Sequence, residues 1–142
     1  MIIKEPFAEL SYDPAVPCLT AQWKAYARSH EFRNFLNQGA IEYHKRKSPQ
    51  VNCGWLADTR NIGVVSKDDM DWLDREWNKQ MYDLGLRHMA LIVPESVFGG
   101  MTVKNYTQNT ENSAAGITTQ VFEDIALAKR WLREWRPVKV GV

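Results

Sequence analysis

An aspartate and an arginine stand where a short apolar run of the chain ends. Residues 51–58 are mostly apolar and too few for a helix, Asp58 is the last of them, and Arg60 follows two positions later. Open α/β sheets bind ligands at the carboxyl ends of their strands, so these side chains are candidates for contact with a small molecule or a peptide. The alternative is an ion pair that braces the loop, or an aspartate that caps the turn, and we favour this structural role.

Ser66 precedes a stretch with the pattern of a helix, and its hydroxyl can accept a hydrogen bond from a free backbone N–H of the first turn. As a functional residue, Ser66 would accept a phosphate or form part of the rim of an anion site. Helix capping is the simpler expectation. Asp68, Asp69 and Asp71 follow and complement the positive end of the helix dipole. They are not expected to bind a metal, because neighbouring helical positions do not surround one cation with oxygens.

Two aromatic residues of the same helix lie off its apolar stripe. At about 100° per residue, Trp72 and Tyr82 fall more than roughly 90° from the centre of the stripe. The stripe itself consists of Met70, Leu73, Trp77, Met81 and Leu84. Either a neighbouring helix or a long loop covers the two rings, or they belong to a partner or homodimer surface. Both outcomes stay open for Trp72, and exposure is expected for Tyr82.

The histidines and cysteines do not form a catalytic or metal-binding pattern. His30, His44 and His88 lack the spacing of metal ligands, and no serine or cysteine stands in a nucleophile motif. We therefore expect a protein that is not an enzyme and that needs no cofactor or metal. A hydrolase built on Asp58 would require His30 or His88 within hydrogen-bond reach of its carboxylate.

Length and charge narrow the class of protein. The chain has 142 residues, with 44% hydrophobic residues, 18 Lys and Arg, and 17 Asp and Glu. This fits one domain over residues 1–142, and the interspersed charges give no surface for nucleic acid. No apolar segment approaches the ~20 residues that cross a bilayer, and no secretory signal is present, so we expect a cytoplasmic protein. Cys18 and Cys53 are then expected to be buried, reduced thiols.

The elements that must position these residues begin with a hairpin. Residues 7–12 and 16–23 flank a turn at 13–15, which predicts two antiparallel strands. Apolar residues recur at helical spacing over residues 30–46, with Ser29 as the N-cap, and a second helix extends from Ser66 to Gly85. Buried strands are expected at residues 51–58 and 88–93.

The carboxyl-terminal part is less regular. Residues 95–116 predict a short helix and a mobile loop, and Gly99-Gly100 is interpreted as a hinge, because Lys104 is not part of a phosphate-binding motif. Residues 117–122 alternate as in a strand, and residues 124–135 predict a helix that buries Ile125, Ala128, Leu132 and Trp135. The order predicts an α/β fold with a mixed sheet of about five strands, the first two antiparallel and the later ones mostly parallel, with helices packed on it.

Several segments carry a family resemblance: residues 56–60 (Leu-Ala-Asp-Thr-Arg), the helix start at 66–73, the strand at 87–94, and residues 122–132. In these segments the chain resembles the SpoIIAA-like group of the STAS superfamily, which is related to anti-sigma-factor antagonists, and the resemblance implies a STAS-like fold. In the antagonists, the first serine of an Asp-Ser-Ser-Gly motif at this helix start accepts a phosphate and switches partner binding. Aligned on Asp58, Ser66 replaces the aspartate and Lys67 the phosphorylated serine, so the switch is expected to be absent. A one-residue slip of the loop would place Ser66 on it.

These patterns favour a non-enzymatic regulatory or binding module of STAS-like fold, which presents a helix and the neighbouring sheet edge to a protein partner. The candidate binding residues are Asp58, Arg60, Ser66, Lys67, Trp72 and Tyr82. The alternative is a small-ligand or lipid-binding domain. An apolar pocket beneath residues 99–116 would favour the ligand, and a flat aromatic surface on the second helix would favour the protein partner.

Overall fold

A mixed six-stranded sheet forms the centre of the molecule. The computed structural model describes residues 1–48, 52–94 and 116–137. The strands lie side by side in sequence order: β1 (Ile3–Lys4), β2 (Ala8–Asp13), β3 (Cys18–Trp23), β4 (Gly54–Asp58), β5 (His88–Ile92) and β6 (Thr118–Phe122). The pairs β1–β2 and β2–β3 are antiparallel, and the later pairs are parallel. The predicted mixed α/β sheet with its antiparallel hairpin is confirmed, but there are six strands and not five, because two-residue β1 is too short to form a pattern.

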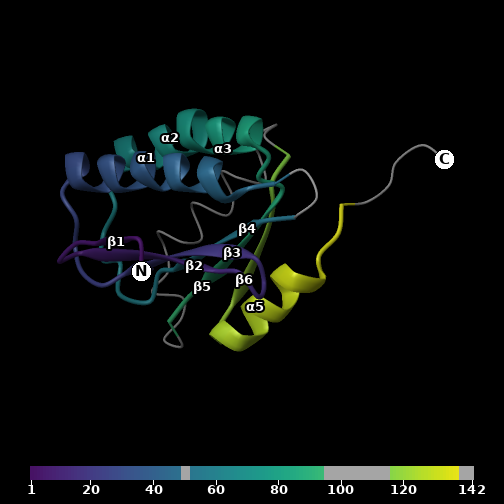
Figure 1. Ribbon diagram of the computed structural model, residues 1–142. Helices are drawn as coiled ribbons and strands as arrows, with labels where there is room; N and C mark the ends of the chain where they lie inside the picture. The colour runs from purple at the N-terminus through teal and green to yellow at the C-terminus, as the bar shows by residue number, and fades with distance from the viewer. Residues whose placement is uncertain (49–51, 95–115, 138–142) are drawn as a thin grey trace.

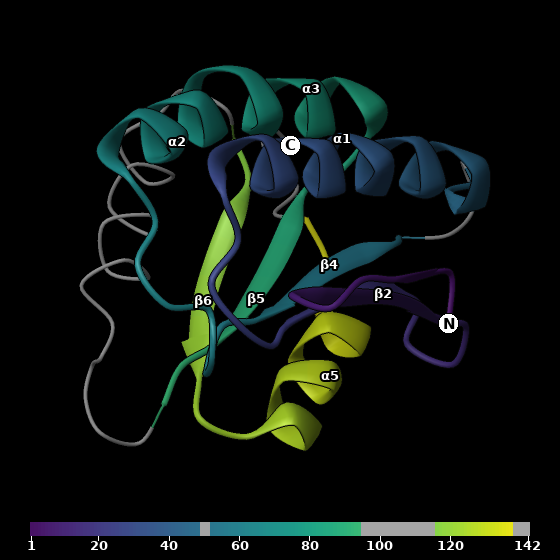
Figure 2. The same ribbon diagram turned by 90° about the vertical axis from the view of Figure 1, so that its left-hand side faces the viewer.

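Helices cover both faces of this sheet. On one face lie α1 (Ser29–Arg46) and a second helical stretch, formed by α2 (Lys67–Trp72), the π-helical turn η1 (Leu73–Trp77) and α3 (Asn78–Leu84). On the other face lies α5 (Ile125–Glu134), as Figures 1 and 2 show. Most of the segment predicted as a short helix and loop, with Gly99, Gly100 and Lys104, lies outside the described residues, as does Val51.

The helix ends agree with the sequence except at one cap. Ser66 caps α2 by accepting a hydrogen bond from the Asp69 N–H at 3.1 Å, and α3 ends at Gly85, whose φ is +116°. Ser29, however, is the first helical residue of α1 and not its N-cap. Arg28 takes that position, and its backbone N–H donates to the Glu31 carboxylate at 2.9 Å. This leaves the Ser29 hydroxyl free for a different contact.

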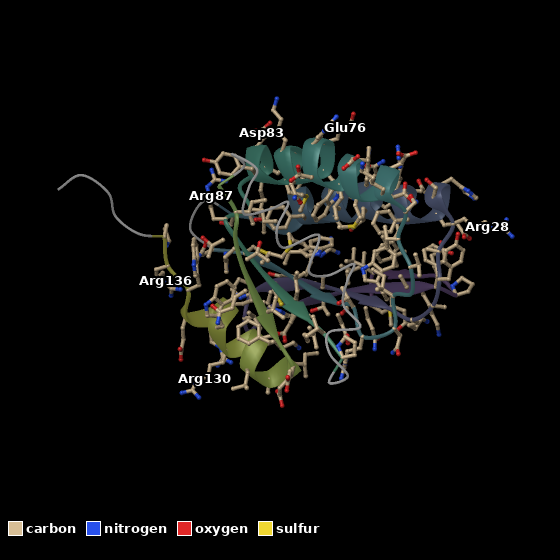
Figure 3. All side chains as sticks on the ribbon, turned by 180° about the vertical axis from the view of Figure 1, so that it is seen from behind. Arg28, Glu76, Asp83, Arg87, Arg130 and Arg136 are labelled. Carbon is tan, nitrogen blue, oxygen red and sulfur yellow. The ribbon has the colours of Figure 1, made fainter. Side chains whose placement is uncertain are left out.

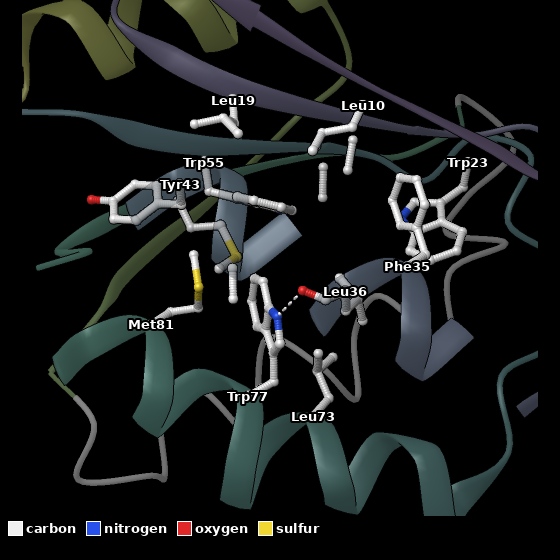
Figure 4. Close-up of a cluster of buried hydrophobic side chains, with 14 of the residues drawn as sticks. Leu10, Leu19, Trp23, Phe35, Leu36, Tyr43, Trp55, Leu73, Trp77 and Met81 are labelled. Atoms are coloured by element: carbon white, nitrogen blue, oxygen red, sulfur yellow. Dashed lines mark hydrogen bonds between the residues drawn. The ribbon is translucent and has the colours of Figure 1, made fainter. Parts of the chain in front are cut away.

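Aromatic side chains fill the larger core, between the sheet and α1, α2 and α3 (Figure 4). The rings of Trp55 and Trp77 meet edge to face at 5.1 Å, and Trp77 Nε1 donates to the Leu36 carbonyl at 2.8 Å. Tyr43 donates its hydroxyl proton to the Cys53 carbonyl at 2.9 Å. All six tryptophans are buried or half-buried, so the high tryptophan count reflects packing within the molecule.

A smaller core lies beneath α5. It consists of Val16, Cys18, Leu56, Ala90, Ile92, Ala128 and Leu132. Ala128 and Leu132 are buried as predicted, but Ile125 is exposed and Trp135 is half-buried, because α5 rests on the sheet through a narrower stripe than the sequence indicates. The Trp135 ring stacks on His88 with 4.5 Å between ring centroids.

The two cysteines are free and buried. Cys18 packs under α5, whereas Cys53 belongs to the aromatic core on the other side of the sheet. Burial raises the pKa of the Cys18 thiol to about 11 and that of Cys53 to about 12. Both side chains are therefore protonated, unreactive packing residues near neutral pH.

Candidate functional site

Asp58 and Arg60 form the loop-bracing ion pair that the sequence favoured. Asp58 is buried at the end of β4. Arg60 Nε donates to Asp58 Oδ1 at 2.9 Å, and Arg60 Nη2 donates to Oδ2 at 2.6 Å. The intervening Thr59 donates its hydroxyl proton to the Ile92 carbonyl at 2.7 Å, which fixes the loop against β5. The pair therefore stabilises the carboxyl edge of the sheet.

A polar groove of about 410 Å³ lies beside this pair, on the α5 side of β2 and β3. Its lining residues include Ser11, Thr20, Gln22, Asp58, Arg60 and Lys129. The charges along it are paired: Lys129 contacts Asp13 at 2.9 Å, and Lys24 contacts Glu9 at 3.2 Å. Every charged side chain of the described lining therefore has a partner of opposite charge.

Asp69 is the unexpected residue of the α2 start, because it is only 4% exposed. It accepts a hydrogen bond from the Ser29 hydroxyl at 2.6 Å and another from Arg33 Nε at 2.8 Å. Burial alone would raise the pKa of Asp69, but hydrogen bonds from Ser29, Arg33 and Ser66 outweigh it and lower that pKa. The network fastens the first turns of α1 and α2 to each other.

Sequence reasoning assigned Asp69 to the helix dipole and missed this network. A usable signal was present, since Asp69 lies one turn before Leu73 and so falls on the stripe that faces the core. Arg33 and Ser29 carried no comparable signal. Their role depends on how α1 and α2 pack together, which no local pattern encodes.

A hollow of about 80 Å³ opens above this network. It lies between the β3–α1 connection, which contributes Tyr26, and the β4–α2 connection, which contributes Ile62, Val64 and Val65. Tyr26 is 65% exposed and Val64 is 77% exposed. We call Tyr26, Ile62, Val64, Val65 and Ser66 the α2-start surface.

An apolar cavity of about 50 Å³ continues inward from the hollow. The two spaces share four lining residues, Trp23, Phe32, Ile62 and Val65, and the cavity extends to Trp55, Trp77 and Met89. The Asp69 network thus borders the hollow through which the cavity opens, and aromatic and aliphatic side chains line the cavity itself. This is an apolar space between helices and sheet, lined by residues of the described ranges. The segment beneath which an apolar pocket was expected lies, except for Gly116, outside the described residues.

Trp72 and Tyr82 pack within the molecule. Trp72 is half-buried, meets Phe32 edge to face at 6.4 Å, and carries the Arg33 guanidinium 5.3 Å from its ring centroid. Tyr82 is half-buried beneath the Arg87 guanidinium, which lies 3.7 Å from its ring centroid. The expectation that Tyr82 is exposed is therefore wrong, because Arg87 and the chain at Gly116 cover its ring. Neither ring offers a flat aromatic surface on the second helix.

Of the six predicted site residues, the structure brings together Asp58 with Arg60. Ser66 joins the α2-start surface, and the exposed Lys67 follows it as the first residue of α2. Trp72 reaches the same region through Arg33, whereas Tyr82 lies toward the other end of the second helical stretch. The candidate residues that the sequence did not indicate are Tyr26, Val64 and the partners of Asp69.

The hydrolase alternative fails for His88. This histidine is buried at the start of β5, opposite Gly54, with its Nε2 3.1 Å from the Leu132 carbonyl oxygen. Asp58 ends the neighbouring strand at its other end and is bound to Arg60. Burial lowers the pKa of His88 to about 4. His30 is exposed in the first turn of α1, and no hydrogen bond joins a histidine to Asp58 in the described part of the chain.

The fold and the site together define an α/β protein with a mixed sheet. At the start of α2, an apolar cavity opens into a hollow that is bordered by the polar Asp69 network. Comparisons with protein-family models, with curated proteins and with solved structures found no match to this chain. Within the described ranges, no helix is long and apolar enough to cross a bilayer. The same ranges contain no group of three or more His, Cys, Asp or Glu side chains placed to hold a metal ion.

Proposed function

We propose that this chain is a non-enzymatic binding module of STAS-like fold that recognises a protein partner through the α2-start surface. The observation that carries the proposal is the exposure of two large apolar side chains, Tyr26 and Val64, next to each other beside a hollow. Gly63, adjacent to Val64, would place a Cβ 3.6 Å from the Tyr26 Cα atom, so the two connections are in contact. Exposed aromatic and aliphatic side chains around a hollow are typical anchors of protein interfaces.

The backbone beneath this surface is held firmly. The N–H groups of Lys24 and Ala25, just before Tyr26, donate to the Phe7 carbonyl at 2.8 and 3.3 Å. The Asp69 network fixes the helices on the other side of the hollow. A preorganised surface loses little conformational entropy on binding, which favours affinity.

Charged and polar residues surround the apolar centre. Arg28, His30, Lys67 and Asp68 are all exposed around it. An apolar centre within a polar rim is the usual arrangement of a protein interface. The surface combines the start of α2 with the connections that follow β3 and β4.

We do not assign a phosphate switch to this module. The Ser66 oxygen accepts the hydrogen bond that caps α2, and Lys67 stands at the position aligned with the phosphorylated serine of the antagonists. Partner binding is therefore constitutive in this proposal. We also propose a cytoplasmic location, supported by the two free, buried thiols.

The test compares two lysine substitutions at exposed aliphatic residues. Val64→Lys alters the α2-start surface, and Ile41→Lys is a matched control on α1, where Ile41 is 56% exposed. Affinity capture is carried out with an extract of the cells in which the protein naturally occurs. The parent and the Ile41 variant should both recover the same partner protein, and the Val64 variant should not recover it. Recovery of the same protein with all three would refute the surface.

A small apolar ligand is the second candidate function, and the cavity that continues from the hollow favours it. Its volume of about 50 Å³ is well below the several hundred Å³ of most ligand sites, which is why we rank this function second. Leu73→Phe should fill the cavity. If a ligand is the true occupant, the parent protein should release a lipid-soluble compound on denaturation, and the Leu73 variant should not.

A further inference from the structure

The two edges of the sheet differ in how they are protected. One edge, β1, has only two residues, includes Lys4 and is followed closely by Pro6. The other edge, β6, has five residues with no charge and no proline (Thr-Thr-Gln-Val-Phe). Short length, lysine and proline are the devices by which proteins prevent an edge strand from pairing with another chain. β1 has all three devices, and β6 has none of them.

The backbone groups of β6 divide into two sets. Thr118 N–H donates to the Arg87 carbonyl at 2.9 Å, and the Phe122 carbonyl accepts from Val93 N–H at 3.0 Å. In a parallel pair, alternate residues direct their N–H and C=O groups to the same side. Gln120 therefore also faces β5, and the backbone groups of Thr119 and Val121 point away from it. Among the described strands, β6 pairs with β5 alone.

Apolar side chains flank this edge on both faces of the sheet. Val121 is 41% exposed, and Leu127, near the start of α5, is 55% exposed. Phe122 and Trp131 are half-buried and their ring centroids lie 5.7 Å apart. In Figure 2, β6 forms the outer margin of the sheet, with α5 beneath it, and Figure 3 shows β6 and α5 from behind. The open edge therefore continues into an apolar margin on α5.

We propose that two copies of this chain associate through antiparallel pairing of their β6 strands, which forms one continuous sheet about a two-fold axis. An uncharged strand can pair with its own copy without repulsion between like charges. Because β6 is the one unprotected edge among the described strands, this pairing closes after two copies, whereas a sheet with two open edges would continue as a fibre.

The apolar side chains of α5 beside β6 indicate that the strand pairs with a second copy of this chain and not with an isolated peptide strand. Across the two-fold axis, the two β5 strands would be three strand spacings apart, which is about 14 Å. Packed helices prefer separations of about 8–10 Å, so the two α5 helices would leave a narrow gap between them. Leu127 and Trp131 of each copy fill that gap over Phe122. A peptide added to β6 alone would leave Leu127 in water.

Sedimentation velocity over a range of protein concentrations tests this proposal. The parent should change from a mass of 16.4 kDa to twice that value as concentration rises. Val121→Pro removes an N–H that points away from β5, so it blocks pairing between copies while the β5–β6 ladder stays intact. Val121→Thr retains the N–H and is the control. The Pro variant should stay monomeric, and the Thr variant should dimerise like the parent.

Leu127→Lys supplies a second test that does not alter the strand. Ile41→Lys is its control, because Ile41 has nearly the same exposure, 56% against 55%. We expect the Leu127 variant to weaken dimerisation at least tenfold and the Ile41 variant to leave it unchanged. A parent that stays monomeric at every concentration, or equal weakening by both lysines, would overturn the proposal.

Hydrogen exchange identifies the interface itself. The amides of Thr119 and Val121 should exchange slowly at concentrations that favour the dimer and rapidly at those that favour the monomer. The amide of Thr118, which is bonded within the chain, should change much less. Slow exchange of Thr119 and Val121 in the monomer would mean that the chain covers its own edge, and this result would also overturn the proposal.

Discussion

The Ser29 hydroxyl donates a hydrogen bond to Asp69 Oδ1 at 2.6 Å, although 40 positions separate the two residues in the sequence. This bond and that of Arg33 join α1 to α2 beneath the α2-start surface. This buried network holds the elements on either side of Tyr26 and Val64, the two exposed anchors of the proposed binding surface.

Asp69→Ala should destabilise the protein by roughly 2–3 kcal/mol, because it removes a buried charged acceptor and leaves Ser29 and the Arg33 guanidinium without it. Urea denaturation followed by tryptophan fluorescence measures the change. Asp68→Ala is the control, since Asp68 is exposed one position earlier, and it should stay within about 0.5 kcal/mol of the parent. Equal effects would show that the network does not stabilise the fold.

Ser66→Ala should cost about 1 kcal/mol through loss of the α2 cap, whereas Ser66→Asp should retain the cap and most of the stability. Because the Ser66 oxygen already accepts a hydrogen bond within the chain, Ser66→Ala should weaken partner binding much less than Val64→Lys does. If Ser66→Ala leaves the free energy of unfolding unchanged but abolishes partner binding, Ser66 has a direct functional role and capping does not explain it.

Replacing Trp72 and Tyr82 together with Ser should lower thermal stability without changing the association state, because both rings pack against neighbouring side chains. Calorimetry measures the first effect, and sedimentation at matched concentration measures the second. If the double variant keeps its thermal stability but sediments with a different assembly mass, the two rings form an association surface and the packing explanation is wrong.

Stability should fall on acidification through His88. Burial lowers its pKa to about 4 from a normal value of 6.5, so the folded state favours the neutral ring. The contribution is complete above pH 6.5 and is lost progressively as the pH falls from 6.5 to 4, by up to about 3 kcal/mol. The physical cause is burial, which disfavours the charged ring and outweighs the hydrogen bond between Nε2 and the Leu132 carbonyl, a bond that favours the charged form. Nδ1 is buried with no hydrogen-bond partner in the described part of the chain.

Unfolding free energies measured at pH values from 7 to 4 check this prediction. His88→Gln can keep a donor near the Leu132 carbonyl but does not titrate in this range. Its stability should therefore depend much less on pH than that of the parent. The same acid sensitivity in both proteins would assign the effect to other groups.

Gly39→Ala should destabilise the protein, although alanine normally favours a helix interior over glycine by about 1 kcal/mol. A Cβ at Gly39 would lie 2.7 Å from the Trp55 ring, so this buried ring would have to shift and give up its packing against Trp77. Gln38→Ala, at the exposed neighbouring position, should be neutral or slightly stabilising. The melting temperature of the Gly39 variant should therefore be lower than that of the parent. The melting temperature of the Gln38 variant should be equal to that of the parent or slightly higher.

The periodic elements could be predicted because each depends on a repeated local pattern. Met70, Leu73, Trp77 and Met81 recur at helical spacing, and all four are buried in the structure. The apolar runs that end at Asp58 and Val93 predict strands covered on both faces, and these are β4 and β5. The same reasoning gave the ion pair of Asp58 and Arg60, since its two partners lie only two residues apart.

The sequence by itself determined the order of the described elements apart from β1, the buried stripe of the second helical stretch and the short-range contacts, because these follow from the geometry of a single helix or strand. Only the tertiary structure decided that Asp69 is buried beside Ser29 and Arg33, that Tyr82 is covered, and that β6 is the last of the described strands in the sheet. Each of these depends on which distant segments become neighbours. Such contacts form through the packing of elements, and a pattern within one segment does not encode them.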